Sequence, residues 1–132
     1  MQTRIIKLLI ITVIPVFGAG CDRQVSFSND VKPILTSNCM KCHDGTGEGS
    51  KKSGFNVMTY ETFMKGTKFG PVVVPGNSVS STLFRLVAHK ANPKIQMPPH
   101  HDMSMADQKF EPLTKKQINT IKVWIDQGAK NN

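Results

Sequence analysis

The sequence is poor in cysteine, with only Cys21, Cys39 and Cys42 among its 132 residues. A structural zinc site usually takes four ligands, from a second Cys-x-x-Cys pair or from two histidines spaced three to five residues apart. Neither pattern accompanies Cys39 and Cys42, so zinc is a poor fit. An internal repeat is also absent, and the length suits one small domain.

Acidic residues are scarce as well. The chain has 9 Asp and Glu against 17 Lys and Arg, which gives a formal net charge of +8 at pH 7. A basic surface attracts nucleic acid, anionic lipid or an acidic protein. The basic residues are scattered, and the densest pairs are Lys51-Lys52 and Lys115-Lys116. This distribution fits an evenly solvated surface as well as a docking face.

No hydrophobic run is long enough to span a bilayer. The main apolar stretch, residues 8–17, is shorter than the roughly 20 residues that a spanning helix needs. Arg4 and Lys7 precede it, and the small residues 18–20 follow it. Together these are the parts of a secretory signal peptide, which we predict for residues 1–20 over the alternative of an uncleaved membrane anchor. Export argues against nucleic acid as a partner.

Cys21 directly follows the predicted cleavage site, in the sequence Ala19-Gly20-Cys21. This stretch resembles the lipobox of bacterial lipoproteins, in which the cysteine is lipidated and becomes the new N-terminus. Ordinary cleavage nearby would leave Cys21 as a free thiol, which is a liability in an oxidising compartment. We therefore expect a protein on the periplasmic side, anchored to a bacterial membrane by lipid on Cys21, with residues 21–26 as a short tether.

Cys39 and Cys42 belong to the sequence Cys-Met-Lys-Cys-His, which ends at His43. A thioredoxin-like dithiol needs a strand before its Cys-x-x-Cys and a helix after it. The segment before this motif, residues 27–38, has the apolar spacing of a helix. The segment after it is rich in glycine and predicts a loop over residues 44–54. Neither flank fits the dithiol.

The same motif is the attachment sequence of c-type haem. Two thiols at this spacing reach the vinyl groups along one edge of the macrocycle, and the histidine that follows faces the iron as its proximal ligand. Attachment takes place after export, in agreement with the predicted signal peptide. The sequence therefore predicts one covalent haem c on Cys39 and Cys42, with His43 as an axial ligand.

The second axial position needs a ligand from elsewhere in the chain. Met58 and Met64 fall near a short helix predicted at residues 57–65, where methionine commonly fills gaps in the core. Met97 precedes two prolines, which fix the backbone and keep it out of a helix. A thioether on such a stiff loop loses little entropy on binding iron, so Met97 is the candidate ligand. The alternative is a buried loop methionine.

Four stretches resemble one known family: FSNDVKPILTSNCMKCH (27–43), VVVPGNSVSSTLFRLV (72–87), MPP (97–99) and LTKKQINTIKVWIDQGA (113–129). They are similar to class I c-type cytochromes with a single domain and one haem, of the planctomycete type. The resemblance implies an all-α cytochrome c-like fold over residues 27–132. It also implies that Met97 is the sixth iron ligand, and that the protein is an electron carrier between redox proteins rather than an enzyme. The basic composition suits partners with acidic docking surfaces.

One stretch departs from that family, because residues 100–112 lengthen the link that follows MPP. The simplest interpretation is a surface loop beside the haem edge. The stretch also contains two histidines and two methionines that could bind copper or offer an alternative axial ligand. They are His100, His101, Met103 and Met105. If Met97 does not bind, the open iron would suit a peroxidase-like enzyme or a gas or redox sensor.

Caps and apolar stripes predict the first and last helices. Ser28, Asn29 or Asp30 would cap the first one, and Thr114 with Gln117 forms a capping box for the last. Both helices carry an apolar stripe, and in the family these stripes cross beside the haem. The stripe residues are Val31, Ile34 and Leu35 in the first helix and Ile118, Ile121, Trp124 and Ile125 in the last.

Between these helices the sequence predicts an extended stretch at residues 69–76 and then a helix capped by Asn77 or Ser78. His89 would lie at the C-terminal end of that helix, where the dipole favours it, rather than on a metal. Pro71 or Pro75 would accept a hydrogen bond from the free ring N–H of His43.

Overall fold

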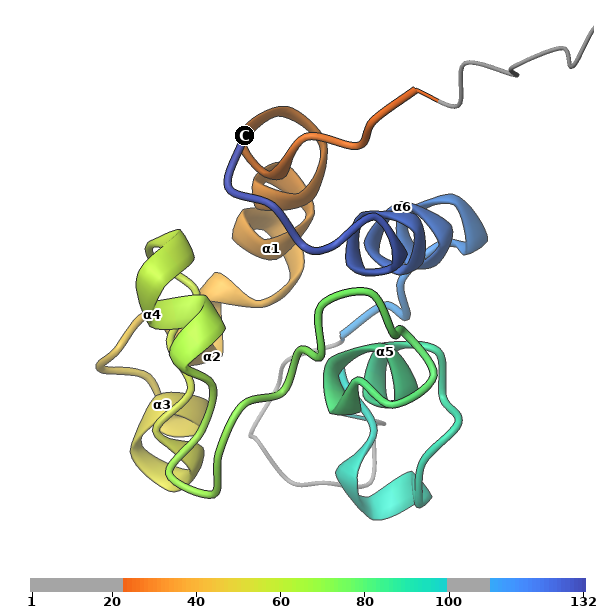
Figure 1. The fold of residues 1–132 in the computed structure, drawn as a ribbon. Coiled ribbons are helices and arrows are strands. Elements are labelled where there is room, and N and C mark those ends of the chain that lie inside the picture. Colours follow the sequence, from red (N-terminus) through yellow and green to blue (C-terminus); the bar gives the residue numbers. More distant parts are fainter. Residues whose placement is uncertain (1–22, 100–109) are drawn as a thin grey trace, which may run out of the picture.

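The computed structural model describes residues 23–99 and 110–132, and these ranges fold into helices joined by loops and turns (Figure 1). In chain order the helices are η1 (Phe27–Val31), α1 (Lys32–Asn38), α2 (Met40–His43), α3 (Glu48–Ser53), α4 (Tyr60–Lys65), α5 (Thr82–Val87), η2 (Pro93–Ile95) and α6 (Lys115–Asp126). Within the described ranges there is no strand, and Thr67 and Gly70 form an isolated bridge. The predicted all-α class is confirmed.

The first helix consists of the π-turn η1, which continues without a break into α1. Its cap is Ser26, whose hydroxyl accepts a hydrogen bond from the Asn29 N–H at 3.2 Å. The prediction of Ser28, Asn29 or Asp30 as the cap was wrong. Asp30 instead accepts a hydrogen bond from the Ser26 N–H at 2.8 Å and pairs with Arg23 at 2.9 Å. Its carboxylate therefore fixes the chain just before the helix.

The last helix, α6, begins at the predicted capping box. The Thr114 hydroxyl accepts from the Gln117 N–H at 3.2 Å, and the Gln117 side chain accepts from the Thr114 N–H at 2.8 Å. Its core-facing residues are Ile121, Trp124, Ile125 and, partly buried, Ile118. The helix packs on η1 and on α5. The predicted packing of the last helix against the first is confirmed.

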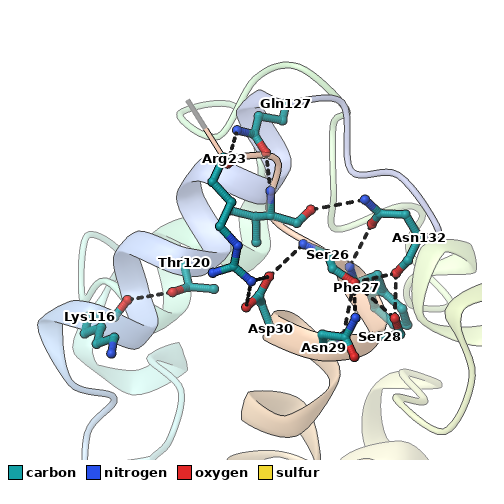
Figure 2. Close-up of polar contacts among 11 residues, drawn as sticks. Arg23, Ser26, Phe27, Ser28, Asn29, Asp30, Lys116, Thr120, Gln127 and Asn132 are labelled. Atoms are coloured by element: carbon teal, nitrogen blue, oxygen red, sulfur yellow. Dashed lines mark hydrogen bonds and ion pairs between the residues drawn. The ribbon is translucent and has the colours of Figure 1, made fainter. Parts of the chain in front are cut away.

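A set of hydrogen bonds joins the segment before the first helix to the segment after the last one (Figure 2). The Asn132 side-chain oxygen accepts from the Phe27 N–H at 2.9 Å, and the Asn132 backbone oxygen accepts from the Ser28 N–H at 2.9 Å. Gln127 Oε1 accepts from the Val25 N–H at 2.7 Å. The entry to η1 is thus held against the exit from α6.

Aromatic rings fill the space between η1, α4 and α6. The ring of Phe63 lies 5.9 Å from that of Trp124 and 5.5 Å from that of Phe55, centroid to centroid. Phe27 lies 5.6 Å from Trp124, and all four rings are buried. The Trp124 indole N–H donates to the Lys130 carbonyl oxygen at 2.9 Å, so its polar atom is satisfied at the edge of this core.

The prediction of a loop over residues 44–54 was wrong, because α3 forms within it. The buried Ser50 hydroxyl accepts from the Gly45 N–H at 2.9 Å and donates to the Phe55 carbonyl oxygen at 2.7 Å. The helix ends at Gly54, whose φ of +77° is the left-handed conformation that glycine adopts readily. These contacts outweigh the low helix propensity of the glycine-rich sequence.

The middle of the chain follows the prediction in outline. α4 lies within the predicted range 57–65, and residues 69–76 contain no helix. α5 begins later than a cap at Asn77 or Ser78 would place it, and Ser81 is its N-cap residue. The reason is that the Ser78 N–H donates to the carboxylate of Asp126 at 2.9 Å, so the segment 77–80 turns toward α6.

Candidate cofactor site

Cys39, Cys42 and His43 lie on one helical turn. The Cys39 N–H donates to the Leu35 carbonyl oxygen at 2.9 Å and so continues α1. The Cys39 carbonyl oxygen then accepts from the N–H groups of Cys42 at 3.1 Å and His43 at 3.0 Å. Both cysteines have free thiols. The turn brings the two thiols and the imidazole to one wall of a cavity.

This cavity lies between α2, residues 53–55, α5 and the loop after α5. The space between its walls is about 770 Å³, part of which is open to solvent. Among the described residues that line it, His43 is the one titratable side chain besides the two thiols. The apolar side chains of its walls are Phe55, Val72, Leu83, Leu86, Val87, Phe110 and Leu113. Such a site suits a large apolar cofactor with few polar anchors.

Met97 and the two prolines after it line the same cavity. The Met97 N–H donates to the Leu86 carbonyl oxygen of α5 at 3.3 Å. Next to it the side chain of Gln96 is buried and donates to the carbonyl oxygens of Ala91 at 2.9 Å and His89 at 3.2 Å. These bonds fix the loop on α5, so the Met97 thioether and the Cys39–His43 turn border one space.

Burial favours the neutral form of the His43 ring. Burial lowers its pKa below the ordinary value of 6.5, and a hydrogen bond with the Phe55 backbone offsets part of that effect. The two rings pack edge to face, with centroids 5.2 Å apart. Nδ1 of His43 is buried and has no hydrogen-bond partner among the described residues. A neutral imidazole with one unsatisfied nitrogen is the form that binds a metal ion.

Nδ1 of His43 has no hydrogen-bond partner among the described residues, so the prediction that Pro71 or Pro75 accepts a hydrogen bond from the ring was wrong. The Val57 N–H donates to the His43 carbonyl oxygen at 2.8 Å, which draws residues 55–57 alongside the histidine. Neither proline lines the cavity. The His43 ring packs against the Phe55 ring instead, and residue spacing along the chain does not predict this tertiary contact.

Gly49 leaves the space that the His43 ring needs. A Cβ at this position would stand 2.6 Å from His43 Cε1, 2.8 Å from His43 Nε2 and 2.8 Å from the Cys42 carbonyl oxygen. Gly49 lies within α3, in a conformation open to any residue, so space rather than flexibility demands glycine here. Sequence reasoning missed Gly49 because it assigned the glycine-rich segment to a loop.

The environment of Cys39 also argues against a redox dithiol. Burial raises the pKa of the Cys39 thiol to about 12, and the nearby Cys42 contributes to the rise. The thiol is therefore protonated at physiological pH. Reactive Cys-x-x-Cys dithiols depend on a lowered pKa, because the thiolate is the nucleophile.

The insert that departs from the family borders the cavity at its C-terminal end, where Phe110 is part of the wall. Residues 100–109 lie outside the described residues, and the predicted copper or ligand role of His100, His101, Met103 and Met105 therefore stays a prediction. In the described ranges, no group of three or more His, Cys, Asp or Glu side chains could hold a metal ion.

His89 lies just past the end of α5, as the sequence predicted. Its φ of +55° is the left-handed conformation that often ends a helix. It is not among the described residues that line the cavity.

Part of the chain matches the model of a known protein family. Residues 39–101 match the model of the family described as Planctomycete cytochrome C. No curated protein and no solved structure matches the chain. The matched segment begins at Cys39 and contains both His43 and Met97. The match confirms the resemblance that the sequence motifs indicated.

The residues of the cavity fit the covalent haem that this family implies. Two free thiols stand one helical turn apart, and a neutral imidazole with a buried, unsatisfied nitrogen follows them. A thioether borders the same space between apolar walls. Thiol, imidazole and thioether are the groups that attach and ligate haem in c-type cytochromes.

Replacing Gly49 by alanine should destabilise the fold, because the added methyl group overlaps the His43 ring and the Cys42 carbonyl group. We expect a loss of about 1–3 kcal/mol in the free energy of unfolding, despite the better helix propensity of alanine. Urea unfolding followed by circular dichroism measures it. Lys52→Ala, at an exposed position of the same helix, is the control and should change the free energy by less than about 0.5 kcal/mol. Equal effects of the two substitutions would contradict this role for Gly49.

Proposed function

We propose that this chain, whose residues 39–101 match the planctomycete cytochrome C family, is a mono-haem cytochrome that carries single electrons between redox proteins. Cys39 and Cys42 hold the haem through thioether bonds, and His43 and Met97 are the axial ligands. One observation carries this proposal: two thiols, an imidazole and a thioether line a single cavity whose other walls are mainly apolar.

When bound, haem c supplies a one-electron iron couple. In the proposed arrangement His43 and Met97 fill both axial positions and leave none for a substrate, which favours a carrier over an enzyme. The hydrogen bond from the Met97 N–H to the Leu86 carbonyl oxygen holds the backbone of this loop on α5, which favours a small rearrangement when an electron is gained or lost. A thioether ligand also raises the reduction potential relative to a second histidine.

Redox partners with acidic docking surfaces suit the charge of this chain, whose formal net charge is +8, or +6 once the predicted signal peptide with Arg4 and Lys7 is removed. Each ion pair in the described part of the chain cancels one charge of each sign and leaves the positive excess unchanged. These pairs are Arg23–Asp30, Lys51–Glu48 and Lys122–Asp126. Opposite charge speeds the encounter of two proteins, and the effect weakens as salt is added.

A haem protein with an open or switchable sixth position is the second candidate function. Phe110 brings the end of the insert to the cavity wall, and the insert contains His100 and His101. If one of these histidines competes with Met97, or if Met97 does not bind, the iron becomes available to peroxide or to diatomic gases. The protein would then be a peroxidase-like enzyme or a sensor.

Met97→Ala separates the two functions. For the haem-loaded native protein we expect a low-spin spectrum with the weak far-red band of sulfur–iron coordination and no reaction with carbon monoxide. The variant should lose that band, bind carbon monoxide and have a lower reduction potential. Met58→Ala is the control, because Met58 is 44% exposed and does not line the cavity. A high-spin native spectrum that shifts on adding carbon monoxide or cyanide would contradict the carrier and favour the open site.

We also propose that the protein is exported and tethered to a membrane by lipid on Cys21. Residues 1–22 lie outside the described residues, so this proposal rests on the basic, apolar and small-residue segments of the sequence and on the lipobox-like Ala19-Gly20-Cys21. Among the described residues no helix is long and apolar enough to cross a membrane. Covalent haem attachment after export agrees with this location.

Cys21→Ser should remove the lipid and shift most of the protein from the membrane fraction to the soluble periplasmic fraction. Immunoblots of fractionated cells and the mass of the purified chain measure this. Gln24→Ala, three residues further along at an exposed position, is the control and should stay with the membrane. If Cys21→Ser remains in the membrane fraction to the same extent, the tether lies elsewhere.

A further inference from the structure

A second pocket lies beside the cofactor cavity. It is formed by the end of α4, the turn that follows it and residues 54–56. The two hollows share Thr67, which lines both. The Lys68 N–H donates to the carbonyl oxygen of Ser53 at 2.8 Å, and Ser53 belongs to the cavity wall. The segment after α4 thus passes beside α3 (Figure 1).

This second pocket is cationic. Lys65 and Lys68 line it, and no carboxylate is among its described lining residues. Neither lysine takes part in an ion pair of the described chain. The Lys68 ammonium group lies 5.2 Å from the ring centroid of Phe69, which holds that side chain against the turn. Two lysines that line one pocket without carboxylate partners attract an anion.

The other charged groups on the surrounding elements do not line this pocket. Glu61 lies on α4, and Glu48, Lys51 and Lys52 lie on α3. Lys51 is paired with Glu48 at 3.2 Å. The field at the pocket is therefore set mainly by Lys65 and Lys68.

The cofactor cavity itself offers little to an anion. Its polar side chains other than the motif are Asn38, Ser53 and Thr67, and each is already bonded to a backbone carbonyl oxygen. Yet a haem attached through its two vinyl groups has two propionate carboxylates, carried on the edge away from the thioether bonds. A carboxylate buried without a cation or hydrogen-bond donors is costly.

We propose that Lys65 and Lys68 bind a haem propionate at the edge of the cofactor cavity next to Thr67. This inference rests on the proposed covalent haem, and it identifies residues outside the Cys-x-x-Cys-His motif and the Met97 loop that act on it. Two lysines near a propionate favour its ionised form and lower its pKa. They also hold the reduction potential above the value that the site would have without them, because positive charge favours the reduced iron.

The test is the reduction potential of the full-length, haem-loaded protein as a function of pH, compared between two double variants. Lys65→Gln with Lys68→Gln removes the cations of the pocket. Lys115→Gln with Lys116→Gln removes the same charge from exposed positions of α6 and is the control. The reduction potential falls over the pH range in which the propionate loses its proton. In the first variant this range should move up by about one pH unit or more, because the lysines no longer stabilise the ionised propionate. In the control it should stay in place.

If the plots of reduction potential against pH coincide for the two double variants, Lys65 and Lys68 do not bind a propionate. Replacing both pocket lysines by arginine keeps the positive charge and should leave the pH dependence of the reduction potential as in the native protein. A shift as large as that of the glutamine variant would also contradict the propionate site. The experiment also separates failure of the proposed function from failure of the propionate site. A native protein without covalent haem would refute both proposals. Covalent haem with coincident curves would refute only this one. If the lysines instead bind a carboxylate of a partner protein, the isolated protein shows coincident curves.

Discussion

The turn from Cys39 to His43 is the constraint on which the candidate site depends. A single carbonyl oxygen, that of Cys39, accepts the N–H groups of both Cys42 and His43, at 3.1 and 3.0 Å. These two hydrogen bonds place both thiols and the imidazole on one wall of the cofactor cavity. The turn is itself held on both sides, by α1 through Leu35 and by the bond between the Val57 N–H and the His43 carbonyl oxygen.

The opposite wall comes from a separate part of the chain, so the site also depends on how α5 is placed. α6 packs on η1, which leads into α1 and the motif, and on α5, which the Met97 loop follows. The aromatic contacts of Trp124 with Phe27 and Phe63 hold α6 on the first side. On the second side, the Gly76 N–H donates to the Ile125 carbonyl oxygen at 2.8 Å. Packing of the last helix therefore sets where Met97 stands relative to the motif.

The sequence predicted what short-range chemistry determines. The Cys39–His43 motif, the Met97 loop and the capping box at Thr114 each depend on residues within a few positions of one another, so spacing alone identifies them. It did not predict α3, the cap at Ser81 or the space at Gly49. Each of these depends on a contact between distant segments or on a side chain that fills a gap, and a single sequence carries no record of such contacts.

Covalent attachment of one haem to Cys39 and Cys42 can be measured as the intact mass of the purified, denatured chain. We expect a mass increase of one haem that persists through denaturation, together with the ferrous pyridine spectrum of haem bound by two thioethers. In a Cys39→Ala, Cys42→Ala variant the increase should be absent. An unmodified native chain, with both thiols open to alkylation after unfolding, would contradict the account.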